Sequence, residues 1–424
     1  MLQPSDTTLV YLLWALAAGA LVAVIAVWPM LAGRGFLPIF GRCAAHLGAS
    51  ALMVLAVAGT LNQQNGWYAS WTDLSHDLTG TAPSIQRQSI TGQRQGGPLY
   101  DRKAALAADR RTQSRFGAER SAFAQRAGLR THTSQQGRYV HLVVPGLGRA
   151  AGRGAGRVLI WLPPSYGSRA ASKTTYPVLQ AYAGIPGGPS DFPQRMRLHT
   201  MITSAHRFNG LTEPIVIMPD YTPGGLDTEC TNSPGVAMDT WLNTTIPNWV
   251  IHHLRARPDR TSWATTGYSA GGFCAQVSAF DHPQRFGAAM LFGSYNHPLW
   301  GNWRPYGRRT VWPAKYNLAT VVRTHPPAVD AWIEVSQSDR FSEPEARRLI
   351  RAVRAPTSLT AVYLPAAGHR FTVWRSVMPT ALAWLARTEP GFRAGRALPT
   401  FSAPSPAAHQ PAQRSAPVSG VALR

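Results

Sequence analysis

Cysteine, lysine and acidic residues are scarce in this sequence, and each shortage excludes a class of protein. Three cysteines among 424 residues are too few for a disulfide scaffold or a cysteine-rich zinc protein. Only 20 acidic residues oppose 42 basic ones, which gives a formal net charge of +22. Because the lysines are only Lys103, Lys173 and Lys315, that charge reflects a bias towards arginine. We therefore expect no nucleic-acid partner, although a basic chain is compatible with one.

Charged residues make up 15% of the chain, below the roughly 25% usual for soluble domains. Hydrophobic residues make up 45%, so the chain can bury a large core. Residues 9–33 carry no charge and exceed the roughly 20 residues needed to cross a bilayer. A second apolar run covers 43–61, with His46 as its one polar ionisable group. Both runs are predicted to be transmembrane helices that form a membrane anchor over 1–61.

Basic residues near the two runs predict their orientation. Arg34 and Arg42 lie between the runs, and no basic residue follows the second run until Arg87. Because basic residues mark the cytoplasmic side, the short loop is expected inside and the large C-terminal part outside. The alternative is a cleavable signal peptide, but the start of the chain lacks its basic region and the apolar stretch is too long.

Three further parts follow the anchor. Residues 62–135 form a polar, Arg-rich linker, which is either one solvated helix and spacer or a patch for anionic lipid or wall polymer. Residues 136–395 alternate strand-like and helix-like runs and are expected to form the catalytic domain. Residues 396–424 are rich in Pro, Ala and Ser and are predicted to be a disordered tail.

The alternation within 136–395 predicts an α/β domain with a mainly parallel sheet flanked by helices. Several of the strand-like runs are continuously apolar, as expected for strands that are covered on both faces. The expected strands occupy 139–146, 157–164, 176–184, 213–221, 261–267, 286–293, 331–339 and 357–365. The expected helices occupy 240–256, 270–281, 343–355 and 372–387. Reactive groups of such a domain belong at the carboxyl ends of its strands.

A nucleophile elbow is predicted at residues 267–271, GYSAG, the one match to G-x-S-x-G in the chain. The motif follows an apolar strand and precedes a helix, which is the context that an exposed nucleophilic serine requires. Gly267 and Gly271 flank Ser269 because the tight turn leaves no room for a Cβ at either position. The alternative is a surface turn rich in glycine and serine.

Ser269 needs a base, and the base needs an acid that orients it. In α/β-hydrolases these groups follow the serine in the order acid, then histidine. Asp339 ends the strand-like run AWIEVSQSD and is the expected acid. His369 follows the last strand-like run, in a loop that Gly368 favours, and is the expected base.

An oxyanion hole requires two backbone N–H donors near the serine. One donor is expected from Ala270, directly after the nucleophile. The other is expected from Ile185 in the loop AGIPGG at 183–188, because Pro186 has no N–H to offer. The alternative for this loop is a plain Gly-Pro turn.

Residues 157–388 resemble the esterase family that includes antigen 85 mycolyltransferases, S-formylglutathione hydrolases and enterochelin-esterase-like proteins. The resemblance rests on IVIMPD at 215–220, TTGYSAGGFCAQVSAFDHPQRFGAAM at 265–290 and GHRFTVW at 368–374. It implies an α/β-hydrolase fold, preceded here by two N-terminal transmembrane helices, and the triad of Ser269, Asp339 and His369. The combination of a membrane anchor and an external domain resembles actinobacterial members.

Cys230 and Cys274 are placed so that a disulfide would tie an active-site loop to the helix after Ser269. An extracytoplasmic location permits the bond, while the alternative is two buried free thiols. Cys43 falls in the second apolar run and is expected to be a small packing residue. No residue spacing suggests a metal site or a cofactor, and we expect neither.

Aromatic residues gather between 294 and 315, where a cover over the substrate is expected. Trp300, Trp303 and Trp312 are candidates for substrate contact, through an acyl chain, a sugar face or an anionic head group. The alternative is that they pack this insertion onto the sheet.

These observations favour a membrane-anchored, extracytoplasmic serine esterase or acyltransferase of the cell envelope. Its substrate is expected to be an ester or an acyl-lipid or acyl-sugar, and an acyl-enzyme passes the acyl group to water or to a hydroxyl. A peptidase with the same triad is a weaker enzymatic alternative. The alternative from another class is a non-catalytic envelope protein that binds polysaccharide or lipid, which the complete set of serine, acid and histidine disfavours.

Overall fold

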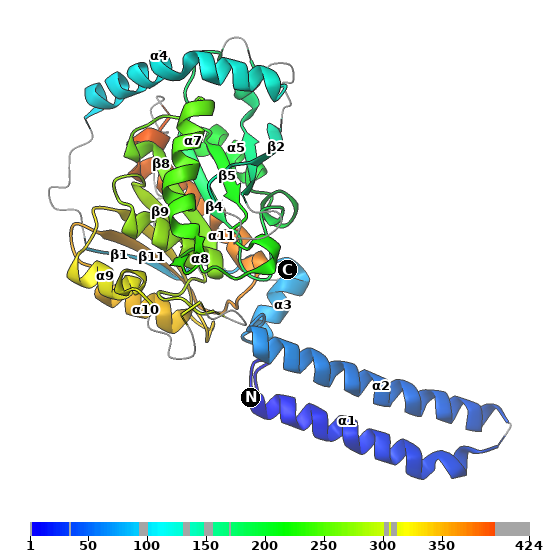
Figure 1. Cartoon of the computed structure of the whole chain (residues 1–424). Coiled ribbons are helices and arrows are strands. Elements are labelled where there is room, and N and C mark those ends of the chain that lie inside the picture. The colour runs from blue at the N-terminus through cyan, green and yellow to red at the C-terminus, as the bar shows by residue number, and fades with distance from the viewer. Residues whose placement is uncertain are drawn as a thin grey trace, which may run out of the picture.

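The computed structural model describes residues 2–33, 35–92, 101–129, 136–147, 156–168, 171–300, 305–306 and 312–394. The expected tail at 396–424, Arg34 and Trp303 lie outside these residues. Figure 1 shows two parts, a long helical hairpin at the N-terminus and an α/β domain from which the hairpin projects.

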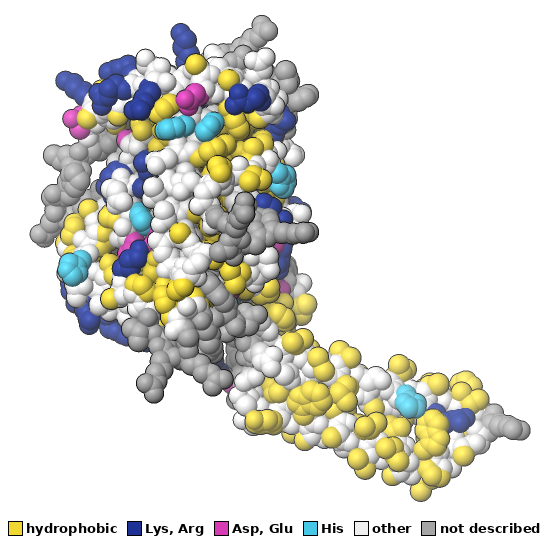
Figure 2. Space-filling model, in the orientation of Figure 1, with side chains coloured by type: hydrophobic (Ala, Val, Ile, Leu, Met, Phe, Trp, Pro, Cys, Tyr) yellow, Lys and Arg dark blue, Asp and Glu magenta, His cyan; other side chains and the backbone are white. Residues whose placement is uncertain are grey.

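The hairpin consists of α1 (Thr7–Val27), a short 3-10 helix η1 (Trp28–Leu31) and α2 (Phe36–Asn65). Both long helices are apolar enough and long enough to cross a membrane. The helix α2 extends at both ends beyond the apolar run of residues 43–61 from which it was predicted. Hydrophobic side chains cover the face of the hairpin seen in Figure 2. Cys43, which was expected to be a packing residue, is a free thiol with an exposed side chain. So large an apolar surface marks an interaction site in a soluble protein and is ordinary for a helix in lipid.

Within the described residues, the main sheet has nine strands in the order β1-β11-β10-β9-β8-β4-β5-β3-β2. The strands from β11 to β5 pair in parallel, and β1, β2 and β3 pair antiparallel to their neighbours. The sheet is therefore mainly parallel, as predicted. Its strands are β1 (Arg87–Thr91), β2 (Arg138–Val143), β3 (Arg157–Leu162), β4 (Val178–Tyr182), β5 (Ile215–Pro219), β8 (Trp263–Tyr268), β9 (Ala288–Phe292), β10 (Asp330–Ser336) and β11 (Ser358–Leu364), while β6 (Asn232–Ser233) and β7 (Val236–Ala237) form a separate small ribbon.

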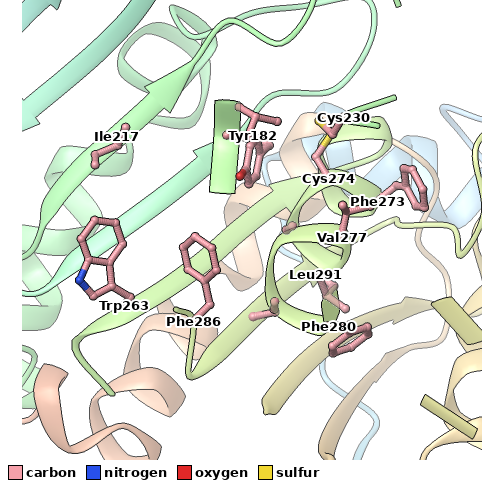
Figure 3. Packing of buried hydrophobic residues seen from close by; sticks show 14 of the residues in the cluster. Tyr182, Ile217, Cys230, Trp263, Phe273, Cys274, Val277, Phe280, Phe286 and Leu291 are labelled. Carbon is pink, nitrogen blue, oxygen red and sulfur yellow. A yellow bond between two sulfur atoms is a disulfide. The ribbon is translucent and has the colours of Figure 1, made fainter. Parts of the chain in front are cut away.

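Helices cover both faces of the sheet and bury one hydrophobic cluster on each. One face carries α5 (Leu198–Asn209) and α11 (Phe371–Thr388). The other carries α7 (Ile246–His253), α8 (Ala270–Gln276), α9 (Leu318–Thr324) and α10 (Glu343–Ala352). Figure 3 shows part of this second cluster, with Trp263 on β8, Leu291 on β9, and Phe273 and Val277 in the helical segment after the elbow. Phe286, just before β9, meets the Trp263 ring edge to face.

Shorter elements connect these layers. They are α3 (Trp71–Thr79), α4 (Arg102–Arg126), α6 (Met238–Thr240), the π-helical turns η4 (Phe192–Met196), η6 (Trp241–Thr245) and η8 (Val277–Asp281), and the 3-10 turns η3 (Pro164–Gly167), η5 (Pro223–Gly225), η7 (Arg260–Ser262), η9 (Ala314–Tyr316) and η10 (Pro390–Phe392).

The expected linker over 62–135 is more structured than a solvated helix and a spacer. Its strand β1 pairs with β11 and so extends the main sheet. Its helix α4 lies across the end of the domain in Figure 1 and packs on α7, where Phe123 meets Trp249 edge to face. The buried guanidinium of Arg120 donates to the Ile251 carbonyl at 2.7 Å. These contacts make 87–92 and 101–126 part of the α/β domain.

Candidate active site

Ser269 occupies a strained turn between the end of β8 and the start of α8. Its backbone has φ 55°, which is rare for a residue with a side chain. A Cβ on Gly267 would lie 2.0 Å from the Gly271 carbonyl oxygen, and one on Gly271 would lie 2.1 Å from the Tyr182 carbonyl oxygen. The glycines thus permit the turn for the predicted reason, and the turn sets the hydroxyl at the carboxyl edge of the sheet.

His369 lies between Ser269 and Asp339. Its Nε2 is 2.9 Å from the Ser269 Oγ, and its Nδ1 is 2.7 Å from an Asp339 carboxylate oxygen. The imidazole is 12% exposed and meets the rings of Trp374 and Phe341 edge to face. The structure therefore brings together the three side chains named from the sequence. They lie in the order required of a nucleophile, its general base and the carboxylate that orients the base.

Asp339 is held by hydrogen bonds from the turn that follows β10. The backbone N–H of Phe341 and the N–H and hydroxyl of Ser342 all donate to its carboxylate. Burial alone would raise the pKa of Asp339, but the His369 imidazole and the Ser342 bonds outweigh it and leave that pKa below its ordinary value. Asp339 is thus kept ionised where it can orient the imidazole.

A second carboxyl group, that of Glu334, lies near the Asp339 carboxylate. Glu334 on β10 is 1% exposed and accepts hydrogen bonds from the Gly293 N–H at 3.1 Å and from the Ser336 hydroxyl. Burial raises the pKa of Glu334 to about 7, and the nearby Asp339 carboxylate adds to the rise. The sequence placed Glu334 in a strand, but no motif marked it as part of the site.

The loop expected to donate to the oxyanion runs beside the serine. A Cβ on Gly184 would lie 3.1 Å from the Ser269 Cβ, tighter than most Cβ contacts, so the glycine favours this close approach of the loop. Tyr221 fixes the loop by donating to the Ala183 carbonyl at 2.5 Å. Ile185 lines the same pocket as Ser269, and the Ala270 N–H opens α8, where it has no acceptor within the helix.

Cys230 and Cys274 form a disulfide, which Figure 3 shows between a loop and the first turns of α8. Both residues are fully buried. The bond ties the loop after β5 to the helix that begins at the nucleophile elbow, as the sequence led us to expect.

The pocket at Ser269 has a volume of about 390 Å³. Among the described residues, its lining does not include Trp300 or Trp312, which were expected to contact substrate. Trp300 instead meets Trp312 and Tyr306 edge to face, and Trp312 stacks on His297. These aromatic side chains pack the insertion together, so the packing alternative describes them, and Trp303 lies outside the described residues.

Several lining residues were not singled out from the sequence. Arg195 and Phe371 form one wall, with the guanidinium 3.5 Å from the centre of the ring. Trp67, Tyr68 and Asp77 form another, although they follow the second apolar helix directly in the chain. Only the adjacent aromatic residues Trp67 and Tyr68 offered a signal for this wall, since nothing local in the sequence connects them with His369. A larger cavity of about 610 Å³ between α4 and η3 contains none of the three residues of the serine–histidine–aspartate arrangement.

Comparison with known proteins agrees with the fold. The putative esterase family matches residues 153–385. A ferulic acid esterase structure is 16% identical with a TM-score of 0.49, over 60% of this chain and 98% of its own. S-formylglutathione hydrolase from Agrobacterium tumefaciens is 17% identical with a TM-score of 0.48, over 61% of this chain and 98% of its own.

MPT51 from Mycobacterium tuberculosis is 16% identical with a TM-score of 0.41, over 58% of this chain and 98% of its own. None of the curated protein sequences compared with the chain matches it. The fold and the family match together define a class of protein: this is an α/β-hydrolase of the esterase type. The chain belongs to the putative esterase family.

Proposed function

We propose that Ser269 is the nucleophile of a membrane-anchored esterase or acyltransferase, with His369 as general base and Asp339 as the acid that orients it. The observation that carries this proposal is the continuous pair of hydrogen bonds from Ser269 through His369 to Asp339. A serine hydroxyl becomes a strong nucleophile only when a base takes its proton, and here the base is in contact.

The reaction proceeds through an acyl-enzyme. Ser269 Oγ attacks the ester carbonyl carbon while its proton passes to His369 Nε2, and Asp339 stabilises the resulting imidazolium. The N–H groups of Ala270 and Ile185 bind the oxyanion. The tetrahedral intermediate collapses, and the leaving alcohol takes the proton from His369. Water or an acceptor hydroxyl then attacks the acyl-serine, with His369 again as base, and releases an acid or a new ester.

The hairpin of α1 and α2 is the proposed membrane anchor. Two helices of sufficient length support it, as does their apolar surface. Asp6, just before α1, accepts a hydrogen bond from Arg340 of the domain at 2.8 Å, so both ends of the hairpin lie at the domain. With Arg34 and Arg42, the basic residues between the two apolar runs of the sequence, on the cytoplasmic side, the domain is extracytoplasmic.

The test is ester turnover by the full chain in detergent, with p-nitrophenyl esters of increasing acyl length. Ser269→Ala is expected to reduce turnover to the background rate because no other hydroxyl is in contact with His369 among the described residues. Ser376→Ala is the matched control, since Ser376 lies on α11 and donates only to the Val373 carbonyl. Equal turnover by the parent chain and Ser269→Ala would contradict the proposal.

A further inference from the structure

The end of the membrane hairpin forms one wall of the active-site pocket. We call residues 65–77 the juxtamembrane segment. Asn65 is the last residue of α2, and it lines the same pocket as Ser269 and His369, together with Trp67, Tyr68 and Asp77 of the segment. The proposed nucleophile and the last residue of the apolar helix α2 therefore line the same pocket.

The loop of His369 is held on this segment by its backbone. The His369 N–H donates to the Gly66 carbonyl at 2.8 Å. A Cβ on Gly368 would lie 2.2 Å from the Trp67 carbonyl oxygen. The backbone of the His369 loop and the backbone of the juxtamembrane segment therefore touch without a side chain between them. The position of the proposed base is thus coupled to the end of α2.

A buried ion pair strengthens the contact. Arg370 donates to the Asp73 carboxylate at 2.7 Å, and their side chains are 10% and 1% exposed. The same guanidinium donates to the Trp67 carbonyl at 2.9 Å and lies 4.7 Å from the centre of the Tyr68 ring. Separation of the segment from the domain would break this ion pair and both further contacts of the Arg370 guanidinium.

Aromatic side chains of the juxtamembrane segment indicate where the boundary between lipid and water lies. Trp67 is 41% exposed and Trp71 is 43% exposed, within six residues of the end of α2. Tryptophans at the end of an apolar helix favour the boundary between lipid and water. Trp67, Ile185 and Phe371 contribute apolar side chains to the lining of the pocket.

From these contacts we propose that the pocket takes esters whose acyl chain lies in the membrane surface, and that the juxtamembrane segment is the wall that guides them to Ser269. This inference rests on the proposed function. A domain held rigidly at the lipid boundary reaches an ester bond in the head-group region while the acyl chain stays in the bilayer.

The experiment uses the full chain in phosphatidylcholine vesicles with two esters, vesicle-inserted p-nitrophenyl palmitate and water-soluble p-nitrophenyl acetate. The quantity measured is the ratio of their kcat/KM values. Trp67→Ala is expected to lower the palmitate-to-acetate ratio about tenfold, because an apolar contact of the acyl chain is lost. Phe208→Ala is the control: Phe208 is an exposed aromatic residue on α5, lies outside the juxtamembrane segment and the pocket lining, and is expected to leave the ratio unchanged.

An unchanged ratio in Trp67→Ala, or an equal fall in both variants, would overturn the inference. A second measurement needs no variant: palmitate turnover by the parent chain is expected to follow the mole fraction of ester in the vesicle. Dependence on bulk concentration at fixed mole fraction would overturn the inference as well. Turnover of acetate without palmitate contradicts only the membrane substrate, whereas turnover of neither ester by the folded chain contradicts the proposed function itself.

Discussion

Glu334 is a fully buried carboxyl beside the proposed triad, and its ionisation links stability to pH. Its folded pKa of about 7 lies above the ordinary value of 4.5 because burial disfavours the charge. The unfolded chain therefore loses this proton at lower pH than the folded chain does. Stability falls as the pH rises from about 4.5 to about 7, by about 3 kcal/mol from this group.

Glu334→Gln is expected to remove this pH dependence and to stabilise the chain at pH 8, while it changes stability little at pH 4.5. The amide oxygen still accepts from the Gly293 N–H, and the amide NH₂ donates to the Ser336 hydroxyl. The measurement is chemical denaturation of the detergent-solubilised chain at several pH values. Glu119→Gln on α4 is the control, since Glu119 is exposed. Parallel stability curves for the parent chain and Glu334→Gln would contradict the account of Glu334.

At the scale of single residues, the sequence was sufficient where a local pattern carries the chemistry. Ser269 follows from its glycines, and Asp339 and His369 follow from the ends of two strands. Glu334 could not be recognised, because a carboxyl in an apolar strand gives no sign of what lies above it. The role of Trp300 and Trp312 could not be predicted either, since a cluster of aromatic residues gives the same sequence pattern whether it contacts substrate or packs only on itself.

At the scale of elements, the turn between β8 and α8 depends on the absence of two Cβ atoms. Gly271→Ala is expected to lower turnover about 100-fold, because the new methyl group meets the Tyr182 and Ala183 carbonyls and displaces Ser269. The fixed backbone on both sides leaves no rotamer that relieves the contact. The measurement is kcat/KM for p-nitrophenyl acetate.

Gly188→Ala tests whether the effect belongs to the elbow. Gly188 lies in the oxyanion loop, but a Cβ there meets nothing within 4 Å. This variant is expected to keep the kcat/KM of the parent chain. A similar loss in both variants would show that the account of the elbow is wrong.

The order and type of the central elements follow from their apolar patterns, but two elements before them do not. The strand β1 is short and polar, with a pattern that is mostly exposed, so its pairing with β11 comes from tertiary contact alone. The helix α4 is rich in arginine and lacks an apolar face along its length. It packs through a few residues such as Phe123 and Arg120, which a charge pattern conceals.

At the scale of the whole molecule, the account places the hairpin in the membrane and the domain outside the cytoplasm. Three lysines test this, because Lys103, Lys173 and Lys315 all follow the anchor. An impermeant amine reagent applied to intact cells is expected to label Lys103 and Lys173, whose side chains are exposed. The exposed Lys315 is expected to react less, because its ion pairs with Asp239 and Asp281 raise the pKa of its ammonium group. Replacement of Lys103 and Lys173 by arginine should remove their signal. Labelling of these lysines only after the cells are permeabilised would contradict the orientation.

The contact between the hairpin and His369 also belongs to this scale, and no pattern in the sequence indicates it. Residues 66 and 369 are far apart in the chain, and the contact is made by backbone groups that leave no side-chain pattern. Arg370 lies beside the predicted base, yet its partner Asp73 is in a segment that resembles a polar linker.

The most direct test of the central claim is to identify the residue that a serine-directed fluorophosphonate modifies in the full chain. The account predicts one adduct, on the peptide that contains Ser269, and its loss in Ser269→Ala but not in Ser376→Ala. Because the probe reacts only with an activated serine, the adduct would show that His369 and Asp339 act on this hydroxyl. A folded chain that forms no adduct, or forms it on another serine, would contradict the claim that Ser269 is the nucleophile.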